Sequence, residues 1–253
     1  MKIIWITGGS SGIGFATAKK FLNNGWKVII SSRDYEKLKI AQKIILEDTV
    51  NKELYIYQCD ISNRNQVNKT IDNISNEVGK INLAVLNAAA YSPNKTQEFL
   101  IENYETLIDV NLKGTLYCIE RLIKEMAAIN NGHIAIVSSP VGYRGLPTAG
   151  AYGLTKAGLI NLAESLFFDF KNKNIKISII NPGFIKSEST KLNTFPMPFL
   201  KSAEFAAEKI FKGLTGTYKF EIFFPWFFLM ILKFLRILPY NFYFYITNKI
   251  TKL

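Results

Sequence analysis

A short apolar run followed at once by a glycine-rich turn opens the chain, and it limits the fold more than any other feature. Lys2–Thr7 is apolar and rich in β-branched residues, which predicts a strand. A turn containing Gly8, Gly12 and Gly14 comes next, and Phe15–Asn24 then has the apolar spacing of a helix. A strand, a glycine turn and a helix in this order direct free backbone N–H groups and the positive end of the helix toward an anion. The opening segment therefore predicts a phosphate-binding turn.

The three glycines have separate expected roles. Gly8 permits a tight turn, Gly12 lets the backbone approach a pyrophosphate, and Gly14 allows the helix to pack closely on the strand. The spacing is G-x-x-x-G-x-G, which differs from the G-x-G-x-x-G of the common dinucleotide fingerprint. A glycine-rich turn without a ligand is the alternative interpretation.

A second group of residues with chemical potential lies in the middle of the chain. Tyr152 and Lys156 are four residues apart, so on a helix they lie on one face, one turn from each other. An ammonium group beside a phenol favours the phenolate, which predicts a lowered tyrosine pKa and proton exchange with an alcohol or carbonyl at neutral pH. Ser139, one loop upstream, is placed to hydrogen-bond the same oxygen. The alternative is an aromatic ring packed under a solvated lysine stem.

Together these segments resemble a known family. Thr7-Gly8-x-x-x-Gly12-Ile13-Gly14, followed by Ser139, Tyr152 and Lys156, is similar to the short-chain dehydrogenase/reductase family, over roughly residues 1–225. The resemblance implies an α/β protein with a single-domain Rossmann fold, in which helices flank a doubly wound parallel β-sheet. It also implies a nicotinamide cofactor and hydride transfer at a carbonyl or alcohol carbon.

The resemblance further assigns catalytic roles to four residues. Tyr152 is expected to be the general acid in reduction and the base in oxidation, and Lys156 to lower its pKa and hold the nicotinamide ribose. Ser139 is expected to position the substrate oxygen. Asn111 lies in a long predicted helix, Glu98–Ala128, which it is expected to kink while supporting a proton relay. The family often forms homodimers or tetramers through the helices that contain Asn111 and Tyr152.

The end of the second predicted strand, Trp26–Ser32, bears on the choice of cofactor. An acidic residue at such a strand end bonds the ribose hydroxyls of NAD, whereas an arginine accommodates the 2′-phosphate of NADP. In the family pattern the acid falls at Ser32, and Arg33 follows it. NADP(H) is therefore the expected cofactor, with NAD(H) as the alternative. The competing interpretation is that Arg33 stacks on adenine and Asp34 caps the next helix.

Further cofactor contacts are expected where later strands end. Leu86 and Ala89 replace the first Asn and the Gly of the family's Asn-Asn-Ala-Gly, and the methyl group of Ala89 is expected to narrow the nicotinamide end. A Pro-Gly turn near residue 182 is expected to contact the nicotinamide carboxamide. The complete set of expected cofactor contacts is Gly8, Ser10, Ser11, Gly12, Ile13, Gly14, Arg33, Asp60, Ile61, Asn87, Ala88, Ala89, Tyr152, Lys156, Pro182, Gly183, Ile185 and Ser187.

Charge and cysteine content narrow the class of protein. The formal net charge is +11, but the lysines are scattered, which argues against nucleic acid and suits a phosphorylated cofactor or an anionic membrane. Cys59 and Cys118 are too few for a disulfide scaffold, and the first residues lack the pattern of a signal peptide, so a cytoplasmic protein is expected. His133 is the only histidine and is interpreted as structural, so we expect no metal site.

The C-terminal residues differ from the rest of the chain, which suggests a catalytic domain, 1–224, and an apolar helical tail, 225–253. Trp226–Leu238 is aromatic and apolar and contains Lys233 and Arg236. The longest uncharged apolar run, Ile222–Leu232, is too short to span a bilayer. Rings beside cations suit a helix lying peripherally on the inner face of the membrane; burial in an oligomer is the alternative. With the apolar lid expected over 188–201, the tail predicts a hydrophobic substrate such as a lipid-derived ketone, a fatty-acyl chain or a steroid-like ring.

Two other functions compete with the oxidoreductase. One is a catalytically inactive dinucleotide-binding regulatory or scaffold protein, against which the four filled catalytic positions argue. The other is an epimerase or dehydratase acting on nucleotide sugars, which uses the same Tyr-x-x-x-Lys chemistry. That class generally carries a larger C-terminal substrate domain, for which this chain has little room.

Overall fold

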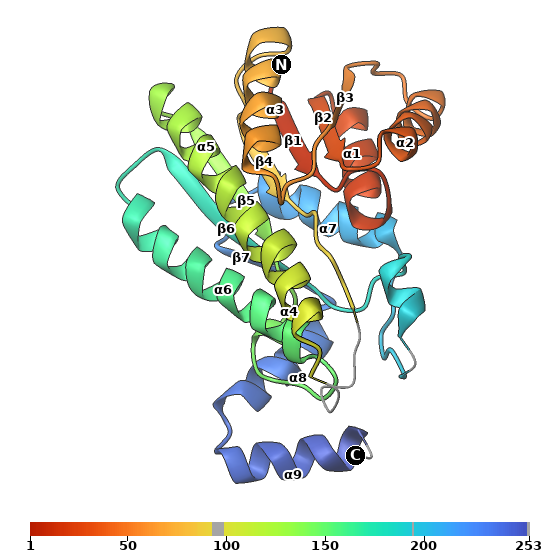
Figure 1. Cartoon of the computed structure of the whole chain (residues 1–253), viewed down its shortest axis with the longest axis vertical. Helices are drawn as coiled ribbons and strands as arrows, with labels where there is room; N and C mark the ends of the chain where they lie inside the picture. The colour runs from red at the N-terminus through yellow and green to blue at the C-terminus, as the bar shows by residue number, and fades with distance from the viewer. Residues whose placement is uncertain (93–98, 194, 252–253) are drawn as a thin grey trace.

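The structure, a computed structural model, describes residues 1–92, 99–193 and 195–251 (Figure 1). Among these residues a parallel, seven-stranded sheet has the order β3-β2-β1-β4-β5-β6-β7. This order confirms the predicted Rossmann fold. The strands are β1 (Ile3–Thr7), β2 (Lys27–Ser32), β3 (Leu54–Gln58), β4 (Leu83–Leu86), β5 (Gly132–Val137), β6 (Ile175–Pro182) and β7 (Glu221–Phe224).

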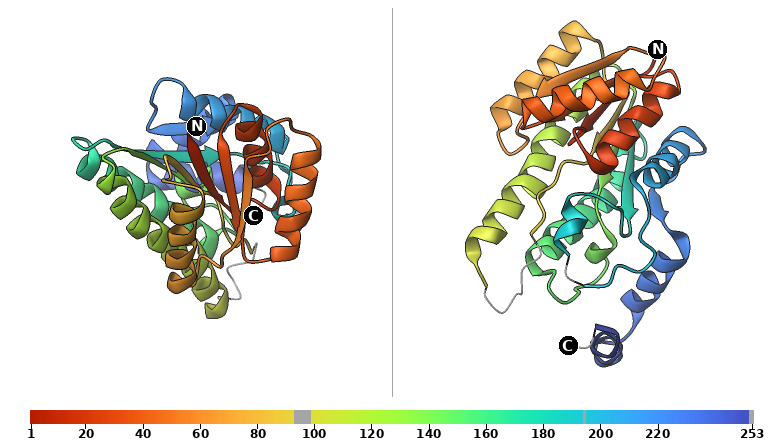
Figure 2. Two further views of the ribbon diagram at one scale, coloured as in Figure 1. Left: turned by 90° about the horizontal axis from the view of Figure 1, so that it is seen from above. Right: turned by 90° about the vertical axis from the view of Figure 1, so that its right-hand side faces the viewer.

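Helices cover both faces of the sheet, as Figures 1 and 2 show. Strand β1 contributes side chains to the hydrophobic core on each face of the sheet. Ile4 and Ile6 point to one face, and Ile3 and Trp5 point to the other. On the first face lie α1 (Gly12–Asn23), α2 (Tyr35–Glu47) and α7 (Ala203–Thr215). On the second face lie α3 (Arg64–Glu77), α5 (Gly114–Ala128) and α6 (Gly150–Phe170).

The strand order creates a crevice at the carboxyl edge of the sheet. From β1 the chain proceeds outward to β2 and β3, and then returns to the other side of β1 to form β4. The loops after β1 and β4 therefore leave the sheet in opposite directions, which is where open α/β sheets bind ligands. Thr7 pairs with Leu86, and Leu86 pairs with Ile136, so the ends of these three strands are level.

The long helix predicted around Asn111 is interrupted. Helix α4 (Ile101–Leu107) passes into a π-helical segment, η2 (Ile108–Lys113), before α5 begins. The predicted start at Glu98 lies outside the described residues. The extra residue in the turn follows from Asn111, whose side chain is fully buried and bonds to groups outside the helix. The kink expected at Asn111 therefore takes the form of a π-helical turn.

The predicted helical tail consists of α8 (Trp226–Ile237) and α9 (Tyr240–Thr251). Helix α8 packs against the sheet layer that α6 covers, because Leu229 is fully buried in that core. Lys233 pairs with Glu221 on β7, the edge strand. None of the helices in 1–92, 99–193 and 195–251 has the length and apolar character needed to cross a lipid bilayer.

We expect the stability of the fold to depend on His133 under acidic conditions. His133 lies on β5, and its Nε2 is 2.9 Å from Ser178 Oγ. Burial, with a smaller effect of Lys176, lowers the pKa of His133 from 6.5 to about 4. Between these two pH values the unfolded chain takes up a proton that the folded chain does not bind, so acidification removes stability. The loss amounts to about 3 kcal/mol by linkage.

Chemical denaturation at pH 7 and pH 4 measures this loss. The variant His133→Gln keeps a hydrogen-bonding group but cannot titrate, so its unfolding free energy is expected to fall less over the same interval. An equal fall in the variant and the wild type would contradict the assignment.

Candidate active site

The glycine turn after β1 has the backbone conformation that its sequence predicts. Gly8 and Gly12 have φ of +67° and +54°, in the left-handed region that favours glycine. The amides of Gly8 and Gly9 donate to the Ser31 carbonyl at 2.7 and 3.1 Å, which fastens the turn to the end of β2. The predicted role of Gly8 in a tight turn is confirmed.

Gly14 is required for the close approach of α1 to the sheet. A Cβ at this position would lie 2.2 Å from the Gly8 carbonyl oxygen and 2.8 Å from Asn87 Nδ2. Asn87 Nδ2 also donates to the carbonyls of Thr7 and Gly8, at 3.1 and 3.2 Å. The helix, the turn and the end of β4 are thus held together here, and the packing role predicted for Gly14 is confirmed.

The start of α1 has the chemistry of an anion site. Ser11, the N-cap residue, makes no side-chain cap hydrogen bond, and the first turn contains no acidic residue. Within the described part of the chain, a Cβ placed on Gly12 would contact only Ser187 Cβ, at 3.4 Å, so the backbone is otherwise open on that side. Ser10 and Ile13 are half-buried beside it. These groups fit a pyrophosphate held by backbone N–H groups at a helix N-terminus.

At the end of β2, Arg33 and Asp34 have different surroundings. Arg33 is exposed, and only its carbonyl is engaged by a described side chain, accepting from Gln58 Nε2 at 3.0 Å. Asp34 caps α2, because its Oδ1 accepts from the Lys37 amide at 3.0 Å. The capping role considered for Asp34 is therefore correct, and its carboxylate is committed to the helix. The Arg33 guanidinium is the group that this strand end offers to a ligand.

The end of β3 is more closed than the sequence indicates. Asp60 Oδ1 accepts from the amide and the hydroxyl of Ser62, at 3.0 and 2.7 Å. Ile61 is buried, and a Cβ on Gly114 of α5 would lie 2.8 Å from it. Asp60 thus stabilises its own turn, and Ile61 packs against α5. Their contact with adenine stays a prediction.

The segment after β4 has Ala89 where the family pattern has Gly, and its backbone conformation is compatible with Ala. The amides of Asn87 and Ala88 both donate to Thr7 Oγ1, at 3.0 Å each, so this segment is held to the end of β1. Ala89 is exposed, and it is not among the described residues with positive φ. A methyl group therefore causes no backbone strain at this position. The narrowing of the nicotinamide end by Ala89 stays a prediction.

Tyr152 and Lys156 share one face of α6, at the carboxyl edge of the sheet. Lys156 is 2% exposed, and its Nζ donates to the Val137 carbonyl at the end of β5, at 2.9 Å. Its Nζ lies 5.5 Å from the centre of the Tyr152 ring. Burial lowers the pKa of Lys156 from 10.5 to about 8. The predicted juxtaposition of the two side chains is thus present.

The expected direction of the Tyr152 pKa shift is wrong for this structure. Burial is the largest influence and raises the pKa of Tyr152 above its ordinary value, with a smaller contribution from Tyr91. A hydrogen bond with Ser139 opposes the rise without cancelling it. The Lys156 ammonium is turned toward the Val137 carbonyl, so it does not offset the loss of solvation. The phenol is accordingly protonated at neutral pH, the state a proton donor requires.

Asn111 connects the site to its surroundings. Its Oδ1 accepts from the Ala90 amide at 2.7 Å, and its Nδ2 donates to the Ala90 carbonyl at 3.0 Å and to Thr155 Oγ1 at 3.1 Å. Thr155 in turn donates to the Tyr152 carbonyl at 2.9 Å. The side chain thus joins the segment after β4 to the helix of Tyr152. The kink expected at Asn111 corresponds to η2, while its part in a proton relay stays a prediction.

Sequence reasoning missed Tyr91 as a neighbour of the site. Its ring meets that of Tyr152 edge-on, with 4.9 Å between the centres, and its hydroxyl bonds to Asn193 Oδ1. Tyr91 follows the end of β4, where an α/β sheet places its ligand-binding loops. The position of Tyr91 directly after the end of this strand could therefore have indicated that it lies near the site.

The Pro-Gly turn after β6 packs against the C-terminal helices. The Gly183 amide donates to the Phe224 carbonyl at 2.7 Å, and a Cβ on Gly183 would lie 3.2 Å from Leu229 Cδ1. Pro182 ends β6, and Ile185 is buried. The Ser187 amide donates to Thr190 Oγ1 at 2.9 Å. Ser187 Cβ would lie 3.4 Å from a Cβ on Gly12, while the contact of Ser187 with the nicotinamide carboxamide stays a prediction.

Aromatic side chains connect the segment expected to form a lid with the tail. Phe184 lies 6.0 Å from Phe195 and 5.7 Å from Phe228, between ring centres. Phe199 lies 5.8 Å from Phe228. Residue 194, within the expected lid, lies outside the described residues. We call Phe184, Phe195, Phe199 and Phe228 the aromatic cluster; it makes this side of the crevice apolar.

The chain matches known proteins over most of its length. A family model described as short chain dehydrogenase matches residues 2–195. A 3-oxoacyl-[acyl-carrier-protein] reductase, FabG, of Rickettsia typhi is 34% identical over 212 residues, which cover 83% of this chain and 82% of the relative. An uncharacterized oxidoreductase of Myxococcus xanthus is 30% identical over 234 residues, which cover 92% and 91%.

The fold also matches a solved structure described as ElxO with NADP bound. The TM-score is 0.78 at 29% identity, and the match covers 88% of this chain and 97% of the other. A Tyr-to-Phe variant of ElxO is described with NADPH bound, with the same score, identity and coverage.

Proposed function

The chain belongs to the short-chain dehydrogenase family and is an oxidoreductase acting on C=O or CH–OH groups, and from this premise we propose that it uses NADP(H) on a hydrophobic substrate. The observation that carries the proposal is that Tyr152, Ser139 and Lys156 meet at the carboxyl edge of the sheet, where the glycine turn also lies. A bound nicotinamide cofactor would donate or accept the hydride there.

The chain's own residues supply the proton and orient the substrate. In reduction, Tyr152 gives its phenolic proton to the carbonyl oxygen as the carbon receives hydride, so the product is an alcohol. Ser139, already bonded to Tyr152, is suited to hold the same oxygen. Lys156, with its pKa near 8, can exchange a proton near neutral pH, and its role in holding the nicotinamide ribose follows from the family resemblance. In oxidation the proton moves in the reverse direction, and this requires Tyr152 as the phenolate.

The preference for NADP(H) over NAD(H) is supported by the exposed Arg33 beside the glycine turn. Replacing Arg33 by Ser removes the group proposed to bind the 2′-phosphate, so kcat/KM with NADPH is expected to fall by roughly tenfold to a hundredfold. The value with NADH should not change, because NADH lacks that phosphate. Steady-state kinetics with both cofactors measure the difference.

Lys43→Ser on the exposed side of α2 is the matched control, since it also removes one positive charge but lies away from the strand end. An equal loss with both cofactors, or a similar loss in the control, would contradict the role of Arg33.

A hydrophobic substrate is supported by the aromatic cluster beside the crevice. A lipid-derived ketone, a fatty-acyl chain or a steroid-like ring would each bury apolar surface there. The Rickettsia relative is named as a 3-oxoacyl reductase, which makes a 3-oxoacyl thioester a suitable first probe, with a steroid ketone as the second. Consumption of NADPH with either probe, absent without enzyme, tests the proposal.

The proposed assembly is a homodimer or tetramer formed through η2–α5 and α6. Leu116 on α5, and Leu154 and Phe168 on α6, are large apolar side chains that are exposed on these helices, which supports this interface. The proposed location is the cytoplasm, at the inner face of the membrane.

A purely regulatory or scaffold role is not favoured, because Tyr152, Ser139 and Lys156 are all present and grouped.

A further inference from the structure

We propose that the outer surface of the two C-terminal helices docks on a bilayer containing anionic lipid. The inference gives the proposed peripheral location a specific surface, which we call the docking face. The docking face is made of Trp226, Phe227, Met230, Ile231, Phe234 and Ile237 of α8 and Phe242, Phe244 and Tyr245 of α9.

The inner side of α8 is fixed to the protein, so the outer side cannot turn inward. Leu229 is fully buried, and Phe228 and Leu232 pack on the same core. Lys233 pairs with Glu221, which also accepts from Asn181 Nδ2 at 2.8 Å. The two cations that interrupt the apolar run of the sequence therefore differ, since Lys233 faces the sheet while Arg236 is exposed.

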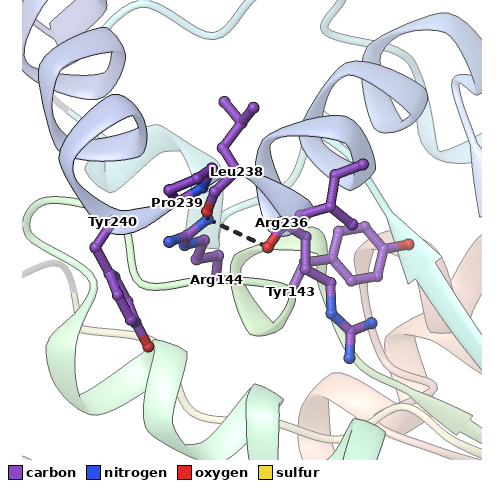
Figure 3. A pocket seen from close by; sticks show the side chains of 7 residues that line it. Tyr143, Arg144, Arg236, Leu238, Pro239 and Tyr240 are labelled. Atoms are coloured by element: carbon purple, nitrogen blue, oxygen red, sulfur yellow. Dashed lines mark hydrogen bonds between the residues drawn. The ribbon is translucent and has the colours of Figure 1, made fainter.

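The corner between α8 and α9 is fastened to the loop that follows Ser139. Figure 3 shows Arg144 at this corner, where its Nη1 donates to the carbonyls of Arg236 and Leu238 at 3.2 and 2.6 Å. The same Nη1 donates to the Leu235 carbonyl at 2.8 Å. Its guanidinium lies 4.0 Å from the centre of the Tyr243 ring, and the Tyr243 hydroxyl bonds to the Gly145 carbonyl. These contacts fix the orientation of both helices relative to the loop that follows Ser139.

With the inner sides occupied, large apolar side chains remain uncovered. On α8 the exposed positions recur at helical spacing, and Trp226, Phe234 and Ile237 are 64%, 58% and 75% exposed. On α9 Phe242 and Tyr245 are 65% and 67% exposed, whereas Tyr243 is 2% exposed. Large apolar side chains exposed in this number on two consecutive helices indicate a binding surface.

Charge and composition favour a lipid surface as the occupant. Residues 225–253 contain no Asp or Glu, and apart from Lys233, which pairs with Glu221, their cations are Arg236, Lys249 and Lys252. Two copies meeting through this surface would bring like charges together, whereas anionic headgroups would neutralise them. Trp, Tyr and Phe beside cations are the composition of helices that lie in the headgroup region. A bilayer with anionic lipid therefore fits better than a second copy.

The docking face borders the segment expected to form a lid. Phe227 lies 6.1 Å from Phe199, between ring centres, and the neighbouring Phe228 belongs to the aromatic cluster. A docked protein would thus hold its apolar entrance near the hydrocarbon boundary, where a hydrophobic carbonyl substrate would be concentrated. This last step rests on the proposed function, but docking itself does not require hydride transfer.

Co-sedimentation of the full chain with vesicles tests the docking face. Vesicles of phosphatidylglycerol and phosphatidylcholine in equal parts should bring down the wild type, and vesicles of phosphatidylcholine alone should bring down much less. Phe227→Ser with Phe234→Ser should lower the partition coefficient at least tenfold. The matched control, Ile40→Ser with Ile44→Ser, removes exposed apolar residues from α2 and should bind as the wild type does.

Recovery of the wild type in the supernatant, or unchanged binding of the double variant, would overturn the proposal. A wild-type mass that drops to a smaller assembly in the double variant, without vesicle binding by either, would assign the surface to a second copy and also overturn it. If the double variant loses the wild-type melting profile, Ile237→Ser gives the same comparison with one change. Truncation at residue 224 is a poor test, because it removes Leu229 from the core.

NADPH consumption measured on the same variants without vesicles separates this proposal from the proposed function. Retained consumption with lost vesicle binding supports docking alone, whereas vesicle binding by a protein that never consumes NADPH leaves docking intact and removes the proposed reaction.

Discussion

Replacing Tyr152 by Phe is expected to lower kcat for carbonyl reduction by roughly 10²- to 10⁴-fold, the range typical of removing a positioned general acid. The ring would still fill the space beside Tyr91, whose ring centre is 4.9 Å away, so the site should keep its shape. Only the proton donor and its hydrogen bond with Ser139 disappear. NADPH affinity, measured by fluorescence titration, should therefore remain near the wild-type value.

Tyr91→Phe is the matched control for this experiment. It also removes one tyrosine hydroxyl from the same ring pair, but that hydroxyl bonds to Asn193 rather than to Ser139. We expect Tyr91→Phe to retain most of the wild-type kcat. A Tyr152→Phe enzyme that turns over at the wild-type rate would remove Tyr152 from the catalytic role.

Gly14→Ala should weaken both the fold and cofactor binding. The new Cβ would lie 2.2 Å from the Gly8 carbonyl oxygen, a backbone atom that can move only if the glycine turn moves with it. Overpacking of this kind typically destabilises a protein by about 1–3 kcal/mol. Since the same turn forms the anion site, NADPH affinity should fall at least tenfold, which corresponds to about 1.4 kcal/mol. Thermal unfolding and cofactor titration measure the two effects.

A glycine with open space around it provides the comparison. Among the described residues, and apart from the two chain neighbours, no heavy atom lies within 4 Å of a Cβ built on Gly145, so Gly145→Ala should change stability by no more than about 0.5 kcal/mol. If Gly14→Ala bound NADPH as tightly as the wild type, the close packing of α1 would not be what shapes the cofactor site.

The elements that the sequence predicted well are those set by local chemistry. The positive φ of Gly8 and the close packing at Gly14 follow from residue type and spacing, and so does the capping role considered for Asp34. The parallel strands were predictable because each apolar run is short and ends in turn-forming residues. The grouping at the carboxyl edge then follows from the topology of such sheets.

What the sequence could not predict depends on burial and on side-chain direction. Helical spacing placed Lys156 near Tyr152, but it does not reveal that Nζ bonds to the Val137 carbonyl, so the sign of the Tyr152 pKa shift was predicted wrongly. The π-helical turn at Asn111 likewise depends on contacts with Ala90 and Thr155, which are distant in the sequence. The tail was recognisable as apolar, but which side of α8 faces the sheet became clear only from Leu229 and Lys233.

The central claim is that Tyr152 protonates a carbonyl beside a nicotinamide held by the glycine turn, and deuterium transfer tests it most directly. A 3-oxoacyl thioester would be reduced with NADPH labelled at C4 of the nicotinamide, in each of its two deuterated forms. The account predicts that one form alone delivers its deuterium to the carbinol carbon, and that Tyr152→Phe slows this transfer by the factor given above. NADPH oxidation that leaves no label on the product, or transfer that proceeds unchanged in Tyr152→Phe, would contradict it.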